Sequence, residues 1–452
     1  MGNPLGSAAS LVEELAINDG LPLFMESQVE IIENTSVSED ASGIVKWAPC
    51  FAVIWLLYVM NSVLAWYSFG VVFRVIAATG VVFASYLMKD HVVTRKRGSI
   101  AFLTFIYMLW AEMKMDHFIA YLSVVMTFLP FMCIVFWPDE LLKRTYELFR
   151  KVVIFFAIGT AILTALSYVG SISYIPHIEM LSQSALHENR NDYYLVYLGI
   201  FPELNGVDIF FHRACGMMEE PGHFSIVLGL IYLIDRYTHR RINPMIIIAA
   251  IFAFSSTFFL IMLFTEFWSL IVEWKKTLLY LFFAITLSLI VYNALPRDMQ
   301  YVVYYLAYER NMEQVVEAYD SSGSLDEALD ERANDLGKNV YDRLSFDQKL
   351  VGGEGGRFLI LSDYRGFIVA MGYIGFWIVI LISMMTISGA PTLLKISLFL
   401  SLGMIMLHRS WFFYEPFPYF MSFLACVLYK YKIDDVQGAV HFKTEVIECQ
   451  NL

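Results

Sequence analysis

Charged residues are scarce in this sequence. Only 16% of its 452 residues are Asp, Glu, Lys or Arg, 58% are apolar, and the mean hydropathy is +0.58. About a quarter of an ordinary soluble chain is charged, so this composition excludes that class. Apolar runs near bilayer-spanning length recur along the chain, which predicts a polytopic membrane protein. The runs are long and do not alternate with period two, so the expected fold is an all-α bundle of membrane helices.

Cysteine is also rare. The five cysteines show no paired spacing, and only one of them, Cys215, falls in a segment expected outside the membrane. This pattern argues against a disulfide framework and gives no metal-ligand spacing. A basic nucleic-acid-binding surface is equally absent, because the formal net charge is −12. That charge is concentrated in residues 1–45, with eight acids and no base, and residues 297–365, with 14 acids and eight bases.

The first residues lack the basic start and continuous apolar region of a signal peptide, so an acidic cytoplasmic tail is expected there. About twelve membrane helices are expected, and residues 242–274 are long for one helix and short for two. Their predicted positions are 48–66, 69–88, 99–112, 116–137, 152–170, 223–235, 243–256, 258–273, 277–294, 366–386, 391–407 and 416–430.

Clusters of Lys and Arg orient these helices. All the clusters can lie in the cytoplasm, as the positive-inside rule requires, if a break near Ser255–Thr257 separates two short helices. Both termini are then cytoplasmic. The expected segments are a tail (1–45), a first membrane group (46–170), outer loop one (171–222), a central membrane group (223–294), a large helical outer loop (295–365), a C-terminal membrane group (366–432) and a second tail (433–452).

The large outer loop carries signals for structure of its own. Ser324 and Glu327 have capping-box spacing, and "GKNVYDRLSFDQKL" predicts a further short helix before four glycines return the chain to the membrane. A loop of this length with its own helices is usually functional. The sequence therefore predicts that a functional site lies at the outer membrane boundary.

The first outer loop ends in "HRACGMMEEPGHFSIVLGL", residues 212–230, where polar residues lead directly into an apolar helix. Pro221 suits the first turn of that helix, whose free N–H groups and dipole favour an anion. Arg213 precedes it, and Arg357 ends the second loop. Two arginines converging on a helix N-terminus would form a site for a phosphate-rich ligand. Taken singly, an interfacial arginine is as often a membrane anchor.

These residues resemble the O-antigen polymerase and ligase superfamily of integral-membrane glycosyltransferases. Arg213, Gly216, Glu220 and Pro221 match one family pattern, and "GR" at Gly356–Arg357 matches the other. The Glu-Pro form is more typical of polymerases than of ligases. The chain departs from many relatives at "SSTFF", where they carry Ser-Arg-Gly, so part of the site would be built differently here.

The resemblance implies polymerisation of undecaprenyl-diphosphate-linked repeat units at the outer face of a bacterial inner membrane, with release of undecaprenyl diphosphate. It implies a lipid-linked glycan donor and acceptor in the bilayer, and a chain-length regulator is a further candidate partner. No outer loop contains Asp-x-Asp, so neither a metal nor another cofactor is expected. The proposed catalytic residues are Glu220, His223 and His408, and the proposed substrate-binding residues are Arg213, Arg357, Arg365, His212, Tyr194 and Glu219.

Two other functions remain open. A ligase would transfer the finished glycan to another lipid or to protein. A transporter of lipid-linked glycans would place charges near the midplane and often shows internal repeats. No repeat is visible, and the mid-span charges are few, namely Arg74 and Glu266, which could pair with each other or face a cavity. Chemistry concentrated in outer loops favours an enzyme.

Overall fold

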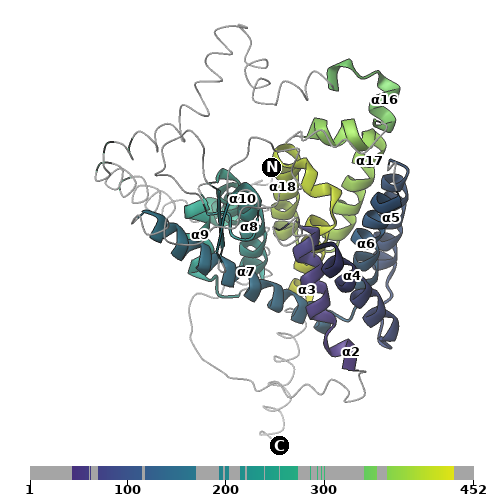
Figure 1. Ribbon diagram of the computed structural model, residues 1–452, viewed down its shortest axis with the longest axis horizontal. Coiled ribbons are helices and arrows are strands. Elements are labelled where there is room, and N and C mark those ends of the chain that lie inside the picture. The colour runs from purple at the N-terminus through teal and green to yellow at the C-terminus, as the bar shows by residue number, and fades with distance from the viewer. Residues whose placement is uncertain are drawn as a thin grey trace, which may run out of the picture. The chain divides into compact units, whose positions relative to one another are not determined.

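The computed structural model describes residues 43–60, 62, 70–114, 118–168, 193–196, 199–202, 214–218, 221–238, 240–253, 255–272, 286, 293, 297, 300, 341–353 and 364–431. Within them the fold is all-α, apart from one antiparallel hairpin of β1 (Tyr193–Val196) and β2 (Gly199–Pro202). The helices (Figure 1) are α2 (Gly43–Lys46), α3 (Ala48–Val59), α4 (Gly70–Leu87), α5 (Arg95–Glu112), α6 (Phe118–Ile134), α7 (Asp139–Tyr168), α8 (Pro221–Tyr237), α9 (Pro244–Ala253), α10 (Ser256–Val272), α16 (Phe346–Val351), α17 (Tyr364–Ile387), α18 (Thr392–His408), the 3-10 helix η5 (Ser410–Tyr414) and a last helix at 417–431.

Helices occupy most positions where the apolar runs predicted them. The break near Ser255 separates α9 from α10, and the short helix expected before the glycines is α16, which starts with a capping box between Ser345 and Gln348. Two described helices are long and apolar enough to cross a bilayer, Asp139–Leu166 and Tyr364–Ile387, and several shorter ones are strongly apolar. Most of the expected helix at 277–294 and most of the two outer loops lie outside the described residues.

Two expected spans differ in shape from the prediction. The span at 152–170 is the second half of α7, which begins at Asp139, because the basic segment before it continues the helix instead of forming a loop. The span at 366–386 belongs to α17, which is kinked at Gly372, where φ is +72°. A positive φ is a conformation that glycine adopts without the steric cost of a Cβ. The glycine at position 372 therefore determines where α17 kinks.

Helix α8 is the centre of one group of helices. Every residue from Pro221 to Asp235 is buried, and α8 packs on α9 and α10. Gly229 permits the contact with α10, because a Cβ there would lie 2.7 Å from Ile261 Cδ1. A second set of contacts joins α3, α4, α5, α6 and α17, and α3 also packs on α7. The aromatic core residues Trp55, Phe131 and Phe420 join α3, α6 and the last helix.

Ion pairs collect at one end of the helices, which we call the basic end. It is marked by the start of α5, the start of α7 and the end of α8, the same regions that the sequence analysis assigned to the cytoplasm. Arg150 Nε binds the fully buried Asp235 at 2.7 Å, and Tyr146 donates to the same carboxylate at 2.8 Å. The further pairs among the described residues are Arg97–Asp139, Arg144–Glu140 at 3.1 Å, Arg236–Glu266 at 2.7 Å and Arg240–Glu147 at 3.2 Å.

Helices α5 and α17 run antiparallel, with two hydrogen bonds fixing their register. Lys96 at the start of α5 donates to the Ser388 carbonyl just after α17, and Trp110 Nε1 donates to the Met371 carbonyl at 2.8 Å. The start of α17 therefore lies at the end of the bundle opposite the basic end.

Candidate functional site

The structure describes two parts of the motif at residues 212–230, namely the segment 214–218 and helix α8 from Pro221 onward. Gly216 has φ +56°, and a Cβ there would lie 2.5 Å from the ring of Phe224. The glycine of the motif is therefore required both by backbone conformation and by close packing. Met218 pairs with Ser62, and α8 begins at Pro221, as predicted. The buried segment holds the start of α8 in a fixed place.

A short aromatic turn packs against this helix start. We define the aromatic turn as Arg409–Glu415, which contains η5 and joins α18 to the last helix. Pro416 follows it and disfavours helical backbone at Glu415, which is extended, with φ −114° and ψ 149°. The sequence Glu-Pro-Phe-Pro after η5 thus explains why the chain turns here before the last helix begins.

Two contacts join the aromatic turn to α8. The rings of His223 and Phe412 meet edge to face, with centroids 5.5 Å apart. A Cβ built on Gly222 would lie 3.3 Å from Nη2 of Arg409, so the guanidinium group lies directly against the first turn of α8. His223 itself is only 4% exposed. A fixed cation and a buried imidazole therefore adjoin the positive end of the α8 dipole.

The start of α17 meets the same turn from another side. Tyr414 donates a hydrogen bond to the Gly366 carbonyl at 3.2 Å, and its ring stacks on Phe367 with centroids 4.8 Å apart. Arg365, half-buried in the first turn of α17, is the neighbour of Gly366. The aromatic turn thus links two helix starts that are distant in sequence.

Residues 341–353 of the large outer loop pack against the kink of α17. Gly352 has φ +87°, and a Cβ there would lie 2.6 Å from the Gly372 backbone nitrogen. The Gly353 N–H donates to the Val369 carbonyl at 2.7 Å, and the hydroxyls of Tyr341 and Tyr373 lie 2.7 Å apart. Two glycine backbones in direct contact fix where this loop begins its return to the bundle.

Glu415 is the most unusual ionisable group at this end. Its Oε2 is buried and has no hydrogen-bond partner among the described residues. Burial raises the pKa of this carboxyl to about 7, and the positive charge of Arg74 opposes the rise. A carboxyl that titrates near neutral pH is suited to accept a proton in catalysis.

Arg74 lies in the first half of α4 and donates to the Ser123 carbonyl at 3.2 Å and to the Thr127 hydroxyl. Its Nε is buried without a partner in the described part of the chain. The suggested pairing of Arg74 with Glu266 is wrong, because Glu266 binds Arg236 through both of its oxygens, at 2.7 and 3.1 Å. Glu266 lies at the basic end of α10, whereas Arg74 lies near the other end of α4 and acts on Glu415.

The structure places four of the proposed site residues. His223 is in the first turn of α8, Arg365 is in the first turn of α17, His408 ends α18, and Tyr194 is opposite Phe201 in the β1–β2 hairpin. The side chains of His408 and Tyr194 lie outside the described residues. So do His212, Arg213, Glu219, Glu220 and Arg357 entirely, and the predicted meeting of Arg213 with Arg357 remains a prediction.

Phe412 and Tyr414 are contacts that the sequence did not single out. Arg409 and Glu415 were suggested from the sequence as residues that line the same cavity as His408. A usable signal was present, because "HRSWFFYEPFPYF" sets one cation and one acid among aromatic residues between two apolar helices. Aromatic residues at a membrane boundary are usually anchors, and that common role obscured the signal.

Chemically, the aromatic turn and the start of α8 combine an arginine, an imidazole, a carboxyl whose pKa is raised to about 7 and the Ser225 hydroxyl, and Ser62 pairs with Met218 just before α8. Ser62 Oγ and Ser225 Oγ are buried and unsatisfied within the described residues. Buried polar atoms normally have a partner, so this region has the capacity to receive a polar ligand. No group of three metal-ligating side chains converges within the described part of the chain.

No known protein family, no curated protein and no solved structure matches this chain in sequence or fold comparison.

Proposed function

We propose that the protein is an integral-membrane glycosyltransferase that polymerises undecaprenyl-diphosphate-linked oligosaccharide repeat units on the outer face of a bacterial inner membrane. The proposal starts from the resemblance of Arg213–Pro221 and Gly356–Arg357 to O-antigen polymerases. The contacts around the aromatic turn support it with residues that the resemblance did not include.

The exterior of the helices supports a membrane location. Large apolar side chains point away from the core on several helices, for example Phe102 at 63%, Trp377 at 60% and Phe399 at 57% exposure. In water such surfaces would be costly, whereas lipid tails solvate them. The charged pairs collect at the basic end, where the positive-inside rule places the cytoplasm.

The observation that carries the proposal is the position of Arg409 against Gly222. A helix start bears partial positive charge, and the guanidinium group of Arg409 adds a second positive group directly beside it, so the two together suit an anionic ligand. An arginine fork binds phosphate oxygens in bidentate fashion and remains charged at any physiological pH. The start of α8 is therefore suited to hold a diphosphate, with Arg409 as one clamp residue.

The proposed reaction is a single displacement. The acceptor sugar hydroxyl attacks the anomeric carbon of the donor glycan and forms the new glycosidic bond. The bond from that carbon to the diphosphate oxygen breaks, and its electron pair leaves with undecaprenyl diphosphate. The hydroxyl proton passes to a base. Fixed cations stabilise the growing negative charge on the leaving diphosphate, which is the usual largest contribution of such sites.

Glu415 joins the candidate bases Glu220, His223 and His408. Its unsatisfied Oε2 and its pKa of about 7 suit proton acceptance at neutral pH. It belongs to the same short turn as Arg409, so one rigid segment would supply both a diphosphate clamp and a proton acceptor. We therefore favour Glu415 as the base and Arg409, Arg213 and Arg357 as cations of the diphosphate site.

The test is complementation of a strain that lacks the gene, followed by mass analysis of its lipid-linked glycans. Arg409→Ala, Arg213→Ala and Arg357→Ala should each accumulate single repeat units with no long chains. Arg409→Lys should also fail if two parallel hydrogen bonds to phosphate are needed. Arg241→Ala, which changes an exposed arginine at the basic end, is the matched control and should polymerise normally.

Two results would contradict the proposal. Normal chain length from Arg409→Ala at wild-type protein level would remove Arg409 from the site. Long chains that form normally but fail to reach a second acceptor molecule would identify a ligase. Purified protein given only a lipid-linked repeat unit separates these cases, because a polymerase needs no other acceptor species.

A further inference from the structure

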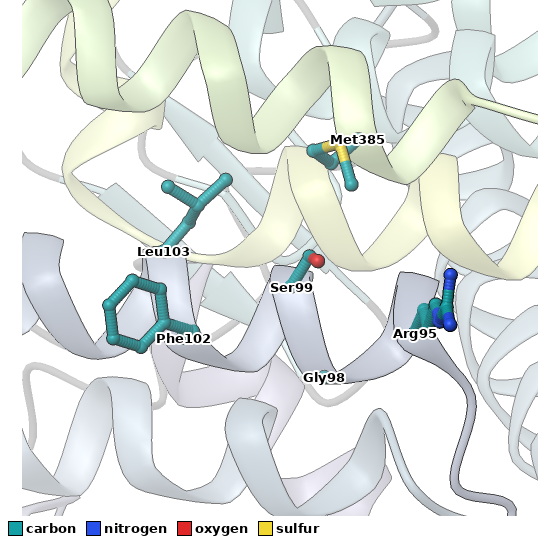
Figure 2. A pocket seen from close by; sticks show the side chains of 6 residues that line it. All are labelled: Arg95, Gly98, Ser99, Phe102, Leu103 and Met385. Atoms are coloured by element: carbon teal, nitrogen blue, oxygen red, sulfur yellow. The ribbon is translucent and has the colours of Figure 1, made fainter.

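A groove at the basic end lies outside the site described above. It has a volume of about 620 Å³ and lies between the first half of α5 and the last turns of α17. Figure 2 shows Arg95, Ser99, Phe102 and Leu103 along one face of α5, with Met385 facing them from α17. Arg95 is at one end of the groove, Phe102 and Leu103 are at the other, and Met385 lies between them, across from Ser99. The groove is therefore amphipathic along its length.

The polar end of the groove carries several positively charged side chains, and the nearby acidic side chains that the structure describes do not neutralise all of them. α5 begins with Arg95, Lys96 and Arg97 and has no acid in its first turn. Cations at a helix N-terminus oppose the helix dipole. Burial lowers the pKa of Lys96, and the charges of Arg97 and Lys395 lower it further. Lys395 at the start of α18 thus adds to the same positive field.

Described acids do not neutralise this charge. Asp139 is bound by Arg97, and Arg97 also donates to the Trp137 carbonyl at 2.5 Å. Lys96 donates to a carbonyl, that of Ser388. Among the described residues, no ion pair joins Arg95 or Lys96 to a carboxylate. Arg95 is exposed at the mouth of the groove and points to an anion from outside the chain.

We propose that this groove binds one anionic glycerophospholipid of the leaflet at the basic end. Its phosphate would lie by Arg95 and the first turn of α5, and an acyl chain would pass between Ser99 and Met385 towards Phe102 and Leu103. The seven-residue separation of Arg95 and Phe102 corresponds to about 10 Å along the helix, which matches the step from a headgroup phosphate to the first part of an acyl chain. Basic pockets between membrane helices on the cytoplasmic side commonly bind anionic headgroups.

This geometry also gives the lipid a structural role. Lys96, next to Arg95 in the chain, ties α5 to the end of α17. Towards its other end, α17 carries Arg365 and the kink on which residues 341–353 pack. A lipid that fills the gap between α5 and α17 would stabilise their antiparallel contact. The inference requires a membrane location but no particular chemistry at the aromatic turn.

The test uses the full chain, purified and delipidated in neutral detergent, with native mass spectrometry as the readout. Phosphatidylglycerol should bind as one retained molecule and raise the unfolding temperature, and phosphatidylcholine of the same chain length should do neither. Arg95→Gln should weaken phosphatidylglycerol binding about fivefold, and Arg95→Gln with Lys395→Gln more than that, because each cation near a membrane surface contributes on that scale. Raising NaCl from 0.15 to 1 M should weaken the binding as well.

Two further variants separate the headgroup from the acyl chain. Ser99→Trp fills a half-buried position in the groove and should abolish retention while all the cations remain. Arg144→Gln changes a basic residue outside the groove and should bind as wild type. Equal affinity for the two lipids, or full retention by Arg95→Gln with Lys395→Gln, would overturn the proposal. Displacement by millimolar inorganic phosphate would also overturn it, because it would identify a free phosphate site. Glycan chain length is scored separately, so loss of lipid selectivity with normal polymer would affect this inference alone.

Discussion

The guanidinium group of Arg409 lies against the Cα of Gly222 in the first turn of α8, close enough that a Cβ at residue 222 would be 3.3 Å from Nη2. The two residues belong to different helix junctions, α18–η5 and the start of α8. Their contact depends on the missing side chain of glycine. It couples the position of a cation to the start of a buried helix.

Gly222→Ala should displace Arg409 without unfolding α8. Gly222 has no unusual backbone angle, and the neighbour that must give way is the end of a flexible side chain. Helix propensity changes by no more than about 1 kcal/mol in favour of alanine. We expect an unchanged unfolding temperature and a glycan transfer rate that falls about tenfold or more, because small misplacements of catalytic groups are costly.

Gly403→Ala is the matched control, since a Cβ at that position on α18 meets nothing within 4 Å. It should keep wild-type transfer and gain slightly in stability. Equal transfer by the two alanine variants would show that the position of Arg409 does not matter to the reaction.

Glu415→Gln should change both stability and its dependence on pH. The pKa of Glu415 is raised from 4.5 to about 7 in the folded protein, so the folded state binds the proton more tightly than the unfolded state does. Wild-type stability should therefore decrease as pH rises from about 4.5 to about 7, by at most about 3 kcal/mol at 1.36 kcal/mol per pKa unit. The glutamine variant should lack that decrease and be the more stable protein at pH 8.

The same substitution tests the proposed base. Wild-type transfer should rise with pH through about 7 as the carboxyl ionises. Glu415→Gln should lose about 10²- to 10⁴-fold in rate and show no such rise, while Glu415→Asp retains part of the rate. Wild-type rates from a well-folded Glu415→Gln would assign the proton to one of the other candidates, Glu220, His223 or His408.

Gly372→Ala should weaken the packing of residues 341–353 of the large loop on α17. Gly372 has φ +72°, and a Cβ there would collide with the backbone of Val351 and Leu350, which cannot move aside as a side chain can. The left-handed backbone costs about 1–2 kcal/mol and the overpacking about 1–3 kcal/mol more. Limited proteolysis of residues 341–353 should be faster, and glycan chains should shorten, whereas Gly403→Ala should behave as wild type in both assays. Unchanged proteolysis would show that the glycine contact does not hold the loop.

Local patterns predicted much of the fold. Pro221 marks the start of α8 because proline suits a first helical turn, and Ser255 falls in the break between α9 and α10 because the basic residues required a hairpin there. Gly216 of the motif proved to be a left-handed residue packed under Phe224. Each of these features is decided by a few neighbouring residues, so the sequence contains it.

The suggested pairing of Arg74 with Glu266 was wrong because it depends on tertiary packing and not on neighbouring residues. Arg74 and Glu266 were considered as partners because both are charges within apolar runs, but hydropathy does not say at which level of a helix a charge will meet another. Helix direction and packing placed Glu266 beside Arg236, and Arg74 near Thr127 and the field of Glu415.

The sequence by itself determined that this is a helical, apolar chain with many of its basic residues clustered between the apolar runs, because composition and periodicity act locally on every helix. Only the tertiary structure brought Arg409, Phe412 and Tyr414 onto the starts of α8 and α17, since contacts between distant segments depend on how complete helices pack. Such contacts produce no periodic pattern in the sequences of the segments that make them. The candidate site therefore became visible only once the aromatic turn had a position in space.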